Sequence, residues 1–489
     1  MAYRVEVPVA ATQVAPCPRT GHVPRPGGRR GGAVRVRLLI VLLLSLGALI
    51  PATLPNSSGV NPPAVGAVND TGSWYGSWAT ALVPPADTTV VGYADQTLRM
   101  VVRMSSGGTD VRIRLANTFG TAPVTFASVY VGLRATGAAV RPGSHRRVTF
   151  DGERSVTVPV GQRLFSDAIS VAVPSGGDLV VSMYLPARGS GPASWHPRAR
   201  ASTYLSARGN HAGAESAGTY RKASYSWFFL DGVEVRTRAM GTVVAFGDSI
   251  TDGSRSTIDA NQRYPDILAA RLREAGIDRG VVNTGIAGNR LLSDGVNYGP
   301  NARARFDRDV LDQSGVTDVI VLIGINDIGY GVRVTAADLV AGFRDLIQRA
   351  RAEGVRIHGG TLLPYAGAGY YTVPGERVRR AVNEWIRHSG EFDGVVDFDR
   401  AMRDPEHPSR LRPGYDSGDH LHPSDEGYRA MAYAVDLGLF TAGKSPEATG
   451  GPATPKATGP PPTPKATGVP GAPKATRGPG VPRAGPGVR

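Results

Sequence analysis

The sequence predicts an α/β protein in which a three-layer α/β/α domain with a parallel sheet follows an all-β sandwich or jelly-roll domain. Two patterns predict this fold class. From residue 72 to 238, apolar and polar residues alternate in short runs separated by Gly, Pro, Asn and Ser, and no amphipathic helix intervenes. From residue 241, continuous apolar runs alternate with helical segments, as in a parallel sheet covered by helices on both faces.

The alternating region, 72–238, is expected to form the β domain. Strands are predicted at LRMVVRM (98–104), VRIRL (111–115), VTFASVYV (124–131), SVTVPV (155–160) and LVVSMYL (179–185). Because successive side chains of a strand point to opposite faces, such runs suit antiparallel sheets with one buried face. Some sandwich domains bind carbohydrate, but others only pack on a neighbouring domain, so both roles stay open for this domain.

The second region, 241–440, has the strand–helix order of an α/β domain. Its predicted strands lie at 242–246, 281–283, 319–323, 355–360 and 395–398, and its predicted helices at 264–275, 336–352, 376–387 and 426–437. In open α/β sheets, ligands bind beyond the carboxyl ends of the strands. The residues that follow each strand are therefore the candidates for chemistry.

The N-terminal segment, 1–67, is expected to be a basic n-region followed by a signal peptide or signal anchor. An apolar run at 38–50 follows Arg35 and Arg37, which is the order of a secretory signal, and it is too short to span a bilayer comfortably. We therefore expect a secreted protein cut after Ala67, with an uncleaved membrane anchor as the alternative. The single cysteine, Cys17, precedes the apolar run, so the processed protein would contain no disulfide.

The C-terminal tail, 441–489, is rich in Pro, Gly, Ala, Thr and Lys and repeats the tetrapeptide PKAT, which predicts disorder. The two ends also explain the formal net charge of +14, because 1–37 and 441–489 carry +6 each and leave about +2 for the folded middle. So small a charge argues against a nucleic-acid partner. The basic tail or the β domain could instead contact a cell envelope or a glycan.

Four polar motifs follow predicted strands or precede the last helix. The first strand ends in Gly-Asp-Ser with Ser249, the second leads to Gly288, and the third is followed by Gly-Ile-Asn with Asn326. The last motif is Asp-His-Leu-His-Pro at 419–423. A lone Gly-Asp-Ser is more often a turn or a helix cap than a nucleophile, so the indication of chemistry comes from the combination.

Together these motifs resemble the SGNH hydrolase family of GDSL-like lipases and esterases over residues 241–437, with Ser249, Gly288, Asn326 and His422 as the four signature residues. The resemblance implies a flavodoxin-like α/β/α domain and a secreted serine carboxylic ester hydrolase that acts through an acyl-enzyme on lipid or other small acyl esters. A carbohydrate O-deacetylase is the alternative within the family. A glycan-binding protein with an inert hydrolase domain is the alternative of another class. No cofactor is expected, and no His, Asp and Glu cluster has the spacing of metal ligands.

The chemistry of ester cleavage gives each motif residue a role. A serine hydroxyl becomes a competent nucleophile only when a neighbouring base takes its proton, so Ser249 is expected to attack while His422 accepts that proton. Asp419 would orient the imidazole and stabilise its charged form. The oxyanion would be stabilised by the backbone N–H groups of Ser249 and Gly288 and by the side-chain amide of Asn326.

A second histidine lies close to the predicted base. His420, with Asp416 as its partner, is an alternative pair, but the family spacing of Asp, two residues, His and Pro fits only Asp419 and His422. The second pair is therefore preferred.

Other residues near the motifs are expected to have structural roles. Asp248 and Asp252 flank the serine and would cap backbone groups. His358 lies in a strand pattern and His388 at a helix end, where no catalytic role is needed. Thr251 stands where the Gly-x-Ser-x-Gly elbow of α/β-hydrolases requires glycine, which disfavours that fold.

Two long loops are expected to line a shallow, open substrate cleft. They span 291–302 and 364–374, and the second contains Tyr365, Tyr370 and Tyr371.

Overall fold

The structure, a computed structural model, describes residues 72–85, 92–239, 241–295, 298–330 and 333–441. The predicted signal segment with Cys17, and all of the predicted tail after residue 441, lie outside these residues. The described residues belong to one compact unit. None of the helices described is long and apolar enough to cross a membrane.

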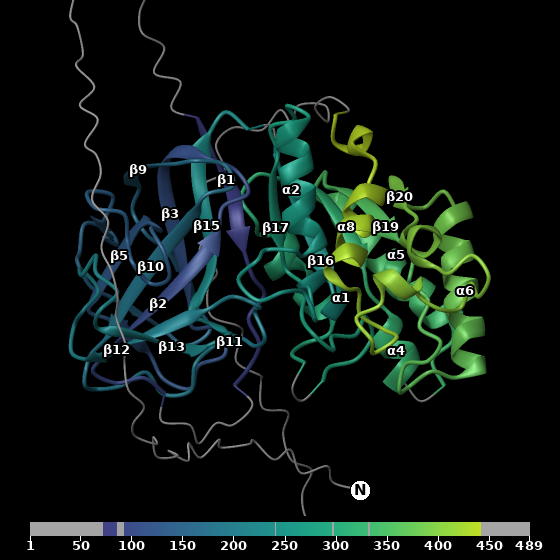
Figure 1. Cartoon of the computed structure of the whole chain (residues 1–489), viewed down its shortest axis with the longest axis horizontal. Helices are drawn as coiled ribbons and strands as arrows, with labels where there is room; N and C mark the ends of the chain where they lie inside the picture. Colours follow the sequence, from purple (N-terminus) through teal and green to yellow (C-terminus); the bar gives the residue numbers. More distant parts are fainter. Residues whose placement is uncertain (1–71, 86–91, 240, 296–297, 331–332, 442–489) are drawn as a thin grey trace, which may run out of the picture. The chain divides into compact units, whose positions relative to one another are not determined.

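The N-terminal part of this unit is an antiparallel β structure (Figure 1). One sheet has the order β1 (Ser73–Ala79), β15 (Leu230–Thr237), β3 (Gly108–Ala116) and β8 (Arg163–Phe165), and β9 (Ile169–Val173) also pairs with β3. A second sheet has the order β13 (Tyr220–Ser224), β12 (Thr203–Arg208), β2 (Gln96–Arg103), β10 (Asp178–Leu185), β5 (Ser128–Leu133) and β6 (Arg146–Arg147). Two short pairs complete it, β4 (Val124–Phe126) with β7 (Val156–Val158) and β11 (Trp195–His196) with β14 (Trp227–Phe228).

The two larger sheets share one apolar core. Alternate residues of β2 and β3 point into it, because side chains of a strand face opposite sides in turn. These residues are Leu98, Met100 and Val102 from one sheet and Val111, Ile113 and Leu115 from the other, and all are at most 1% exposed. All the runs predicted as strands between 98 and 185 contain strands.

The C-terminal part is built on a five-stranded parallel sheet. Its order is β17 (Gly280–Asn283), β16 (Thr242–Gly247), β18 (Val316–Leu322), β19 (Arg356–Gly360) and β20 (Gly394–Val396). The second strand along the chain is thus at one edge, beside the first, and the remaining strands extend the other way. This is the flavodoxin-like order, in which the switch point lies between the first and third strands, here β16 and β18.

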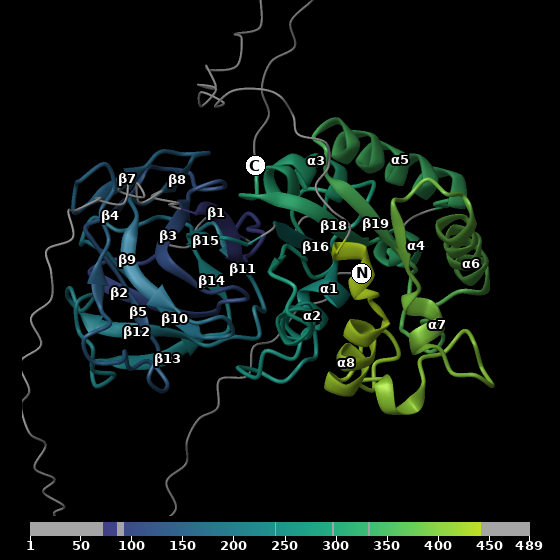
Figure 2. The same ribbon diagram turned by 90° about the horizontal axis from the view of Figure 1, so that it is seen from above.

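Helices cover both faces of the sheet, so the expected three layers are present. Figure 2 shows α2 (Tyr264–Glu274) and α8 (Asp425–Ala434) on one side and α3 (Ala302–Phe306) and α5 (Ala336–Ala352) on the other. The helix α7 (Phe398–Met402) packs on α8, and α6 (Val373–His388) packs on α5. The predicted fold class, an α/β/α domain preceded by a β-rich part, is confirmed.

Helix α5 shows how the sequence sets an element's bounds. Thr335 accepts a hydrogen bond from the Asp338 N–H at 3.2 Å, and the Asp338 carboxylate accepts one from the Thr335 N–H at 2.9 Å, which forms a capping box at the predicted start. Leu339, Phe343 and Leu346 recur at helical spacing and are buried.

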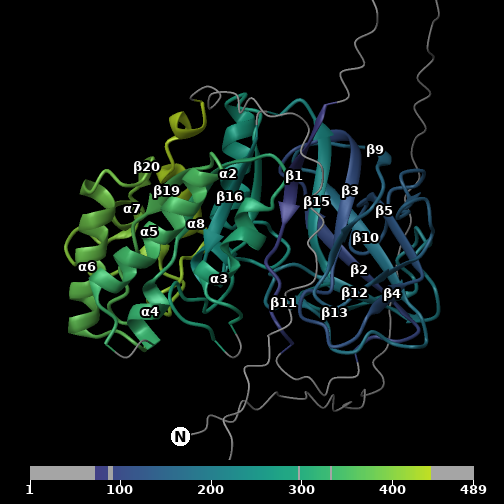
Figure 3. The same ribbon diagram turned by 180° about the vertical axis from the view of Figure 1, so that it is seen from behind.

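The two parts contact each other along β1 and β17. Figure 3 shows β1 on the side of the β part that faces the C-terminal part. The backbone N–H of Gly76 in β1 donates to the Thr242 hydroxyl at 3.0 Å and to the Ser314 carbonyl at 3.1 Å. A Cβ at Gly280 in β17 would lie 2.1 Å from the Gly76 carbonyl oxygen, so glycine is required at this approach. The expected domain limits of 72–238 and 241–440 remain predictions.

Candidate active site

The predicted nucleophile lies in the turn that follows β16. Gly247 ends the strand, and the Asp248 carboxylate accepts a hydrogen bond from the Ile250 N–H at 3.0 Å. Asp248 is therefore the N-cap of the one-turn helix α1 (Ser249–Asp252), as predicted. Ser249 is the first residue of this helix and is 5% exposed.

The structure brings together the three residues predicted to form a triad. The Ser249 Oγ lies 2.8 Å from Nε2 of His422, and Nδ1 of the same ring lies 2.8 Å from Oδ2 of Asp419. Ser249 and His422 are 173 residues apart in the chain. This is the arrangement of a nucleophile, a base and a carboxylate that orients the base.

The Asp419 carboxylate is held as an anion by the residues around it. Its partial burial alone would raise its pKa, but hydrogen bonds from the His422 ring and from the His422 and Leu421 backbone N–H groups hold the pKa well below its usual range. Arg255 also donates from Nε to Oδ2 of Asp419 at 3.0 Å. Asp419 is therefore ready to accept from Nδ1–H of His422, which leaves Nε2 facing the serine as the basic nitrogen.

The two further residues predicted for the oxyanion hole follow the strands on either side of β16. Gly288 lies in the loop after β17, and Asn326 lies in α4 (Ile325–Tyr330), after β18. The Ile286 N–H donates to the Gly247 carbonyl at 3.1 Å, and Nδ2 of Asn326 donates to the Asn289 carbonyl at 3.1 Å. These contacts place the loop and the amide of Asn326 beside the nucleophile turn.

Glycine is needed at 288 for two reasons. Its φ is +78°, which is a left-handed conformation that side chains rarely adopt. A Cβ there would also lie 2.4 Å from the ring of Tyr298. Both observations explain why glycine occupies this position, whose backbone N–H is a predicted oxyanion donor.

Asp327, for which the sequence predicted no role, holds the loop that contains Gly288 through two hydrogen bonds. Oδ2 of Asp327 accepts from the Leu291 N–H at 2.7 Å and Oδ1 accepts from the Leu292 N–H at 2.9 Å. Burial raises the pKa of the Asp327 carboxyl, and these two hydrogen bonds oppose the rise. Its place directly after Asn326 was the only sequence signal for this role.

A buried arginine, also missed, ties the same loop to the nucleophile strand. Arg305 donates to the Gly247 carbonyl at 2.8 Å, to the Thr284 carbonyl at 2.7 Å and to Oδ1 of Asn289 at 2.9 Å. It also pairs with Asp309 at 3.1 Å. Its sequence position gave no signal, since a lone arginine in an arginine-rich chain looks like a surface residue.

The alternative histidine pairs with its predicted partner, Asp416. Nδ1 of His420 lies 2.6 Å from Oδ2 of Asp416, and its ring packs against Gly367. The pair that was weighed therefore forms, but it is His422 that contacts Ser249.

Two histidines have the structural roles that the sequence predicted, and one aspartate does not. His358 is buried and lies 2.9 Å from Asp318, and His388 pairs with Glu384 at the end of α6, so both have structural partners. The prediction for Asp252 was wrong. Its side chain bonds no backbone group among the described residues and instead lies 3.0 Å from Nε2 of His196, because the β part brings this histidine against the end of α1.

Two tyrosines of the second predicted loop, 364–374, differ in their surroundings. Tyr365 is fully buried in the core, so it cannot line an open cleft. Tyr370 donates from its hydroxyl to Oδ1 of Asn326 at 3.3 Å, and its ring contacts Tyr330 edge to face with 4.8 Å between centroids. Burial strongly raises the pKa of Tyr370, so its hydroxyl stays protonated and can donate. Roles for these loops in specificity remain a prediction.

Asp248, the residue before the predicted nucleophile, has a raised pKa. Burial raises the pKa of the Asp248 carboxyl to about 7, and the hydrogen bond from the Ile250 N–H opposes the rise only in part.

No group of three or more His, Cys, Asp or Glu side chains in the described part of the chain is placed to hold a metal ion.

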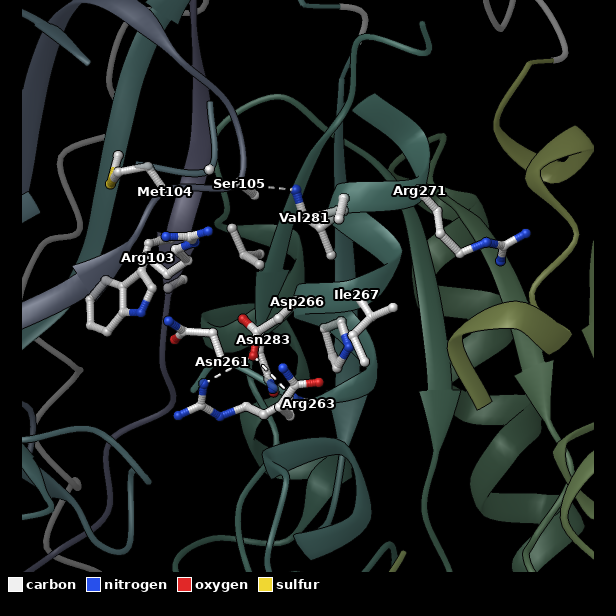
Figure 4. A pocket seen from close by; sticks show the side chains of 18 of the residues that line it. Arg103, Met104, Ser105, Asn261, Arg263, Asp266, Ile267, Arg271, Val281 and Asn283 are labelled. Atoms are coloured by element: carbon white, nitrogen blue, oxygen red, sulfur yellow. Dashed lines mark hydrogen bonds and ion pairs between the residues drawn. The ribbon is translucent and has the colours of Figure 1, made fainter. Parts of the chain in front are cut away.

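A crevice of about 270 Å³ lies between the two parts and reaches the end of α1 (Figure 4). Arg103 and Ser105 of the β part line one side, and Arg263 and Asp266 at the start of α2 line the other. His196 and Asp252 also line it.

Comparisons with known proteins concern the C-terminal part. Residues 245–430 match the GDSL-like Lipase/Acylhydrolase family. Among solved structures, Axe2, an acetyl xylan esterase from Geobacillus stearothermophilus, is 23% identical, with 42% of this chain and 98% of that chain covered and a TM-score of 0.33.

Two further solved structures are similar over 40% of this chain and 95% of their own length. A carbohydrate acetylesterase family member from Sinorhizobium meliloti is 20% identical with a TM-score of 0.34, and an aryl esterase from M. smegmatis is 17% identical with a TM-score of 0.33. No curated protein matches the chain. On the match over residues 245–430, the chain contains a hydrolase domain of the GDSL-like lipase/acylhydrolase family, which confirms the resemblance drawn from its motifs.

Proposed function

We propose that the protein is a serine carboxylic ester hydrolase with Ser249 as nucleophile, His422 as base and Asp419 as the residue that orients the base. The observation that carries the proposal is the contact of 2.8 Å between Ser249 Oγ and His422 Nε2, with Asp419 at 2.8 Å from the other ring nitrogen. It lies within the segment that matches the GDSL-like family, whose members hydrolyse esters.

In the proposed reaction, the Ser249 oxygen attacks the ester carbonyl carbon while its proton passes to Nε2 of His422. The carbonyl oxygen becomes an oxyanion that accepts hydrogen bonds from the Ser249 and Gly288 backbone N–H groups and from the Asn326 side chain. The tetrahedral intermediate collapses, the alkoxide leaves with the proton from His422, and the acyl group stays on Ser249. Water activated by His422 then releases the carboxylic acid.

Asn326 is well prepared for its proposed role. One N–H of its amide is already used by the Asn289 carbonyl, and its oxygen accepts from Tyr370. With both ends of the amide fixed in this way, the second N–H has a set direction before substrate arrives, which is the preorganisation that oxyanion stabilisation requires.

We propose lipid or other small acyl esters as the substrate class, with a carbohydrate O-deacetylase as the alternative. We also propose export from the cell, because an apolar run at 38–50 follows several arginines. A glycan-binding protein with an inert hydrolase domain is the remaining alternative, and ester turnover by the purified protein would exclude it.

A series of chromogenic esters from acetyl to palmitoyl tests the proposal. The purified protein should hydrolyse at least one of them, and Ser249→Ala and His422→Ala should each lose at least about a thousandfold in kcat. His420→Ala is the matched control and should keep its activity. Activity that survives in Ser249→Ala would contradict the proposal, and the preferred acyl length separates lipid esters from acetylated sugars.

A further inference from the structure

We infer that the β part contributes to catalysis. Its His196, in β11, positions the helix that carries Ser249 through a buried hydrogen bond to Asp252. The inference rests on the serine-hydrolase function proposed above. His196 is a positioning residue in this account, since it contacts neither the nucleophile nor the base.

The bond is buried and links distant parts of the chain. Nε2 of His196 lies 3.0 Å from Oδ1 of Asp252, and the two residues are 2% and 4% exposed. The other ring nitrogen, Nδ1, lies 2.8 Å from the Ala81 carbonyl oxygen. Both ring nitrogens of His196 are thus engaged, one with the β part and one with the catalytic helix.

The chemistry of these partners makes the bond strong. A carbonyl oxygen can only accept, so Nδ1 of His196 must carry a proton for its contact with Ala81. The contact with Asp252 then requires one more proton, held either by Nε2 as an imidazolium facing a carboxylate or by the carboxyl group itself. Hydrogen bonds of this kind are strengthened in a buried, low-dielectric environment.

Asp252 depends on this bond. Its second oxygen, Oδ2, is buried and has no hydrogen-bond partner among the described residues. His196 is the one side chain described that bonds this carboxylate. Removal of the imidazole would leave both oxygens buried without a partner, which is unfavourable enough to displace the end of the helix.

The catalytic helix is too short to hold its own geometry. It has one turn, Ser249–Asp252, and ends at Gly253, whose N–H donates to the Ser249 carbonyl at 3.0 Å. One turn fixes several dihedral angles for very few hydrogen bonds, so a helix of this length needs support from its surroundings. A shift at Asp252 is passed to Ser249, because the two residues lie on the same turn.

A second link from the β part reaches the other end of the nucleophile turn. Arg163 of β8 pairs with Asp231 of β15 at 2.8 Å and donates to the Arg308 carbonyl at 3.1 Å. Arg308 and Arg305 both pair with Asp309, at 2.6 Å and 3.1 Å.

Through this second link the β part supports the start of the turn, since Arg305 donates to the Gly247 carbonyl at 2.8 Å. The β part also packs on the loop after β17 that holds Gly288, called the oxyanion loop below, where Ala81 and Val83 form an apolar cluster with Ile286. The nucleophile turn is therefore supported at both ends by contacts that begin in the β part.

Two amide substitutions of His196 separate its two bonds. His196→Gln places an N–H donor where Nε2 lies and can still bond Asp252, whereas His196→Asn places its donor near Nδ1 and can bond only the Ala81 carbonyl. We would measure kcat and KM on the best ester and count active serines by fluorophosphonate titration, so that kcat refers to functional sites and not to total protein.

The inference predicts that His196→Asn lowers kcat per titrated serine by about tenfold or more with KM changed less than about threefold, because a displacement of the nucleophile of the order of an ångström slows the chemical step. His196→Gln should recover most of this loss. Asp252→Ala should resemble His196→Asn, and the double variant should lose no more than either single one, because both remove the same contact.

Equal kcat per titrated serine in the wild type, His196→Asn and Asp252→Ala would overturn the inference, as would additive losses in the double variant. If His196→Asn does not fold, kcat per titrated serine is compared between Asp252→Ala and His196→Gln. Equal values in these two variants would overturn the inference in the same way. A wild-type protein without ester hydrolysis and without fluorophosphonate labelling would overturn the proposed function, and the inference with it. Active wild-type protein with unaffected variants would overturn the inference alone.

Discussion

At the scale of single residues, substitution of a proposed oxyanion donor and substitution of a group that orients it are expected to lower kcat by different amounts. Asn326→Ala removes a hydrogen bond to the oxyanion and should lower kcat by about a hundred- to a thousandfold. Tyr370→Phe removes only the hydroxyl that donates to Asn326 Oδ1 at 3.3 Å, so kcat should fall by about threefold to tenfold. Steady-state kinetics on one ester checks both values.

These two variants also control for each other. If Tyr370→Phe lost as much kcat as Asn326→Ala, the tyrosine would act on the substrate directly and the assigned order of roles would be wrong.

Asp248 leads to a prediction about stability and pH. Burial raises the pKa of its carboxyl from 3.8 to about 7 in the folded protein, so the folded state keeps a proton that the unfolded state has already released. The resulting contribution to stability is complete below about pH 4 and is lost as pH rises towards 7, with a slope of up to about 1.4 kcal/mol per pH unit.

Asp248→Asn should remove this part of the slope, since an amide does not titrate there and its oxygen can still accept from Ile250 N–H. Urea unfolding between pH 4 and 8 measures it, and Asp278→Asn, at an exposed position, is the control. A slope that is the same in the wild type and Asp248→Asn would refute the raised pKa.

At the scale of elements, Arg305 joins the strand β16, the oxyanion loop and the π-helix η1 (Asp307–Leu311). It is fully buried and makes three hydrogen bonds besides its pair with Asp309. Arg305→Lys retains the charge but not the planar fork, so most of these bonds should be lost and the free energy of unfolding should fall by about 3 kcal/mol.

Arg303→Lys is the matched control, because Arg303 lies on the same helix with 47% of its side chain exposed. Its free energy of unfolding should change by less than about 0.5 kcal/mol. Equal stabilities of the two variants in urea unfolding would contradict the role given to Arg305.

The strands of the parallel sheet and its four longest helices could be predicted because each has a local signal. Helix α5 spans the residues predicted for it, 336–352, and the strands β16 to β20 are apolar runs. The contact between Ser249 and His422 needed the family resemblance, since 173 residues separate them. His196 and Arg305 could not be found in this way, because their roles depend on which distant backbone groups the fold brings to them.

At the scale of the whole molecule, the β part supports the hydrolase sheet at its edge. β17 is one of the two edge strands, and β1 lies against it with Gly76 bonded to Thr242 and Ser314. A fragment of residues 241–441 would expose this edge and the apolar surface around Ile286, so it should aggregate or unfold at a clearly lower temperature.

Size-exclusion chromatography and thermal unfolding of that fragment, beside the full chain, check this. A monomeric fragment with an unchanged unfolding temperature and unchanged ester hydrolysis would show that the β part is independent of the site.

The central claim is that Ser249 is the nucleophile of an ester hydrolase. Its most direct test is mass spectrometry of the protein after reaction with a fluorophosphonate, which forms a stable adduct with an activated serine. The account predicts one adduct, on the peptide that contains Ser249, that is lost in Ser249→Ala and forms far more slowly in His422→Ala but not in His420→Ala. An adduct on another residue, or ester hydrolysis without any adduct on Ser249, would contradict it.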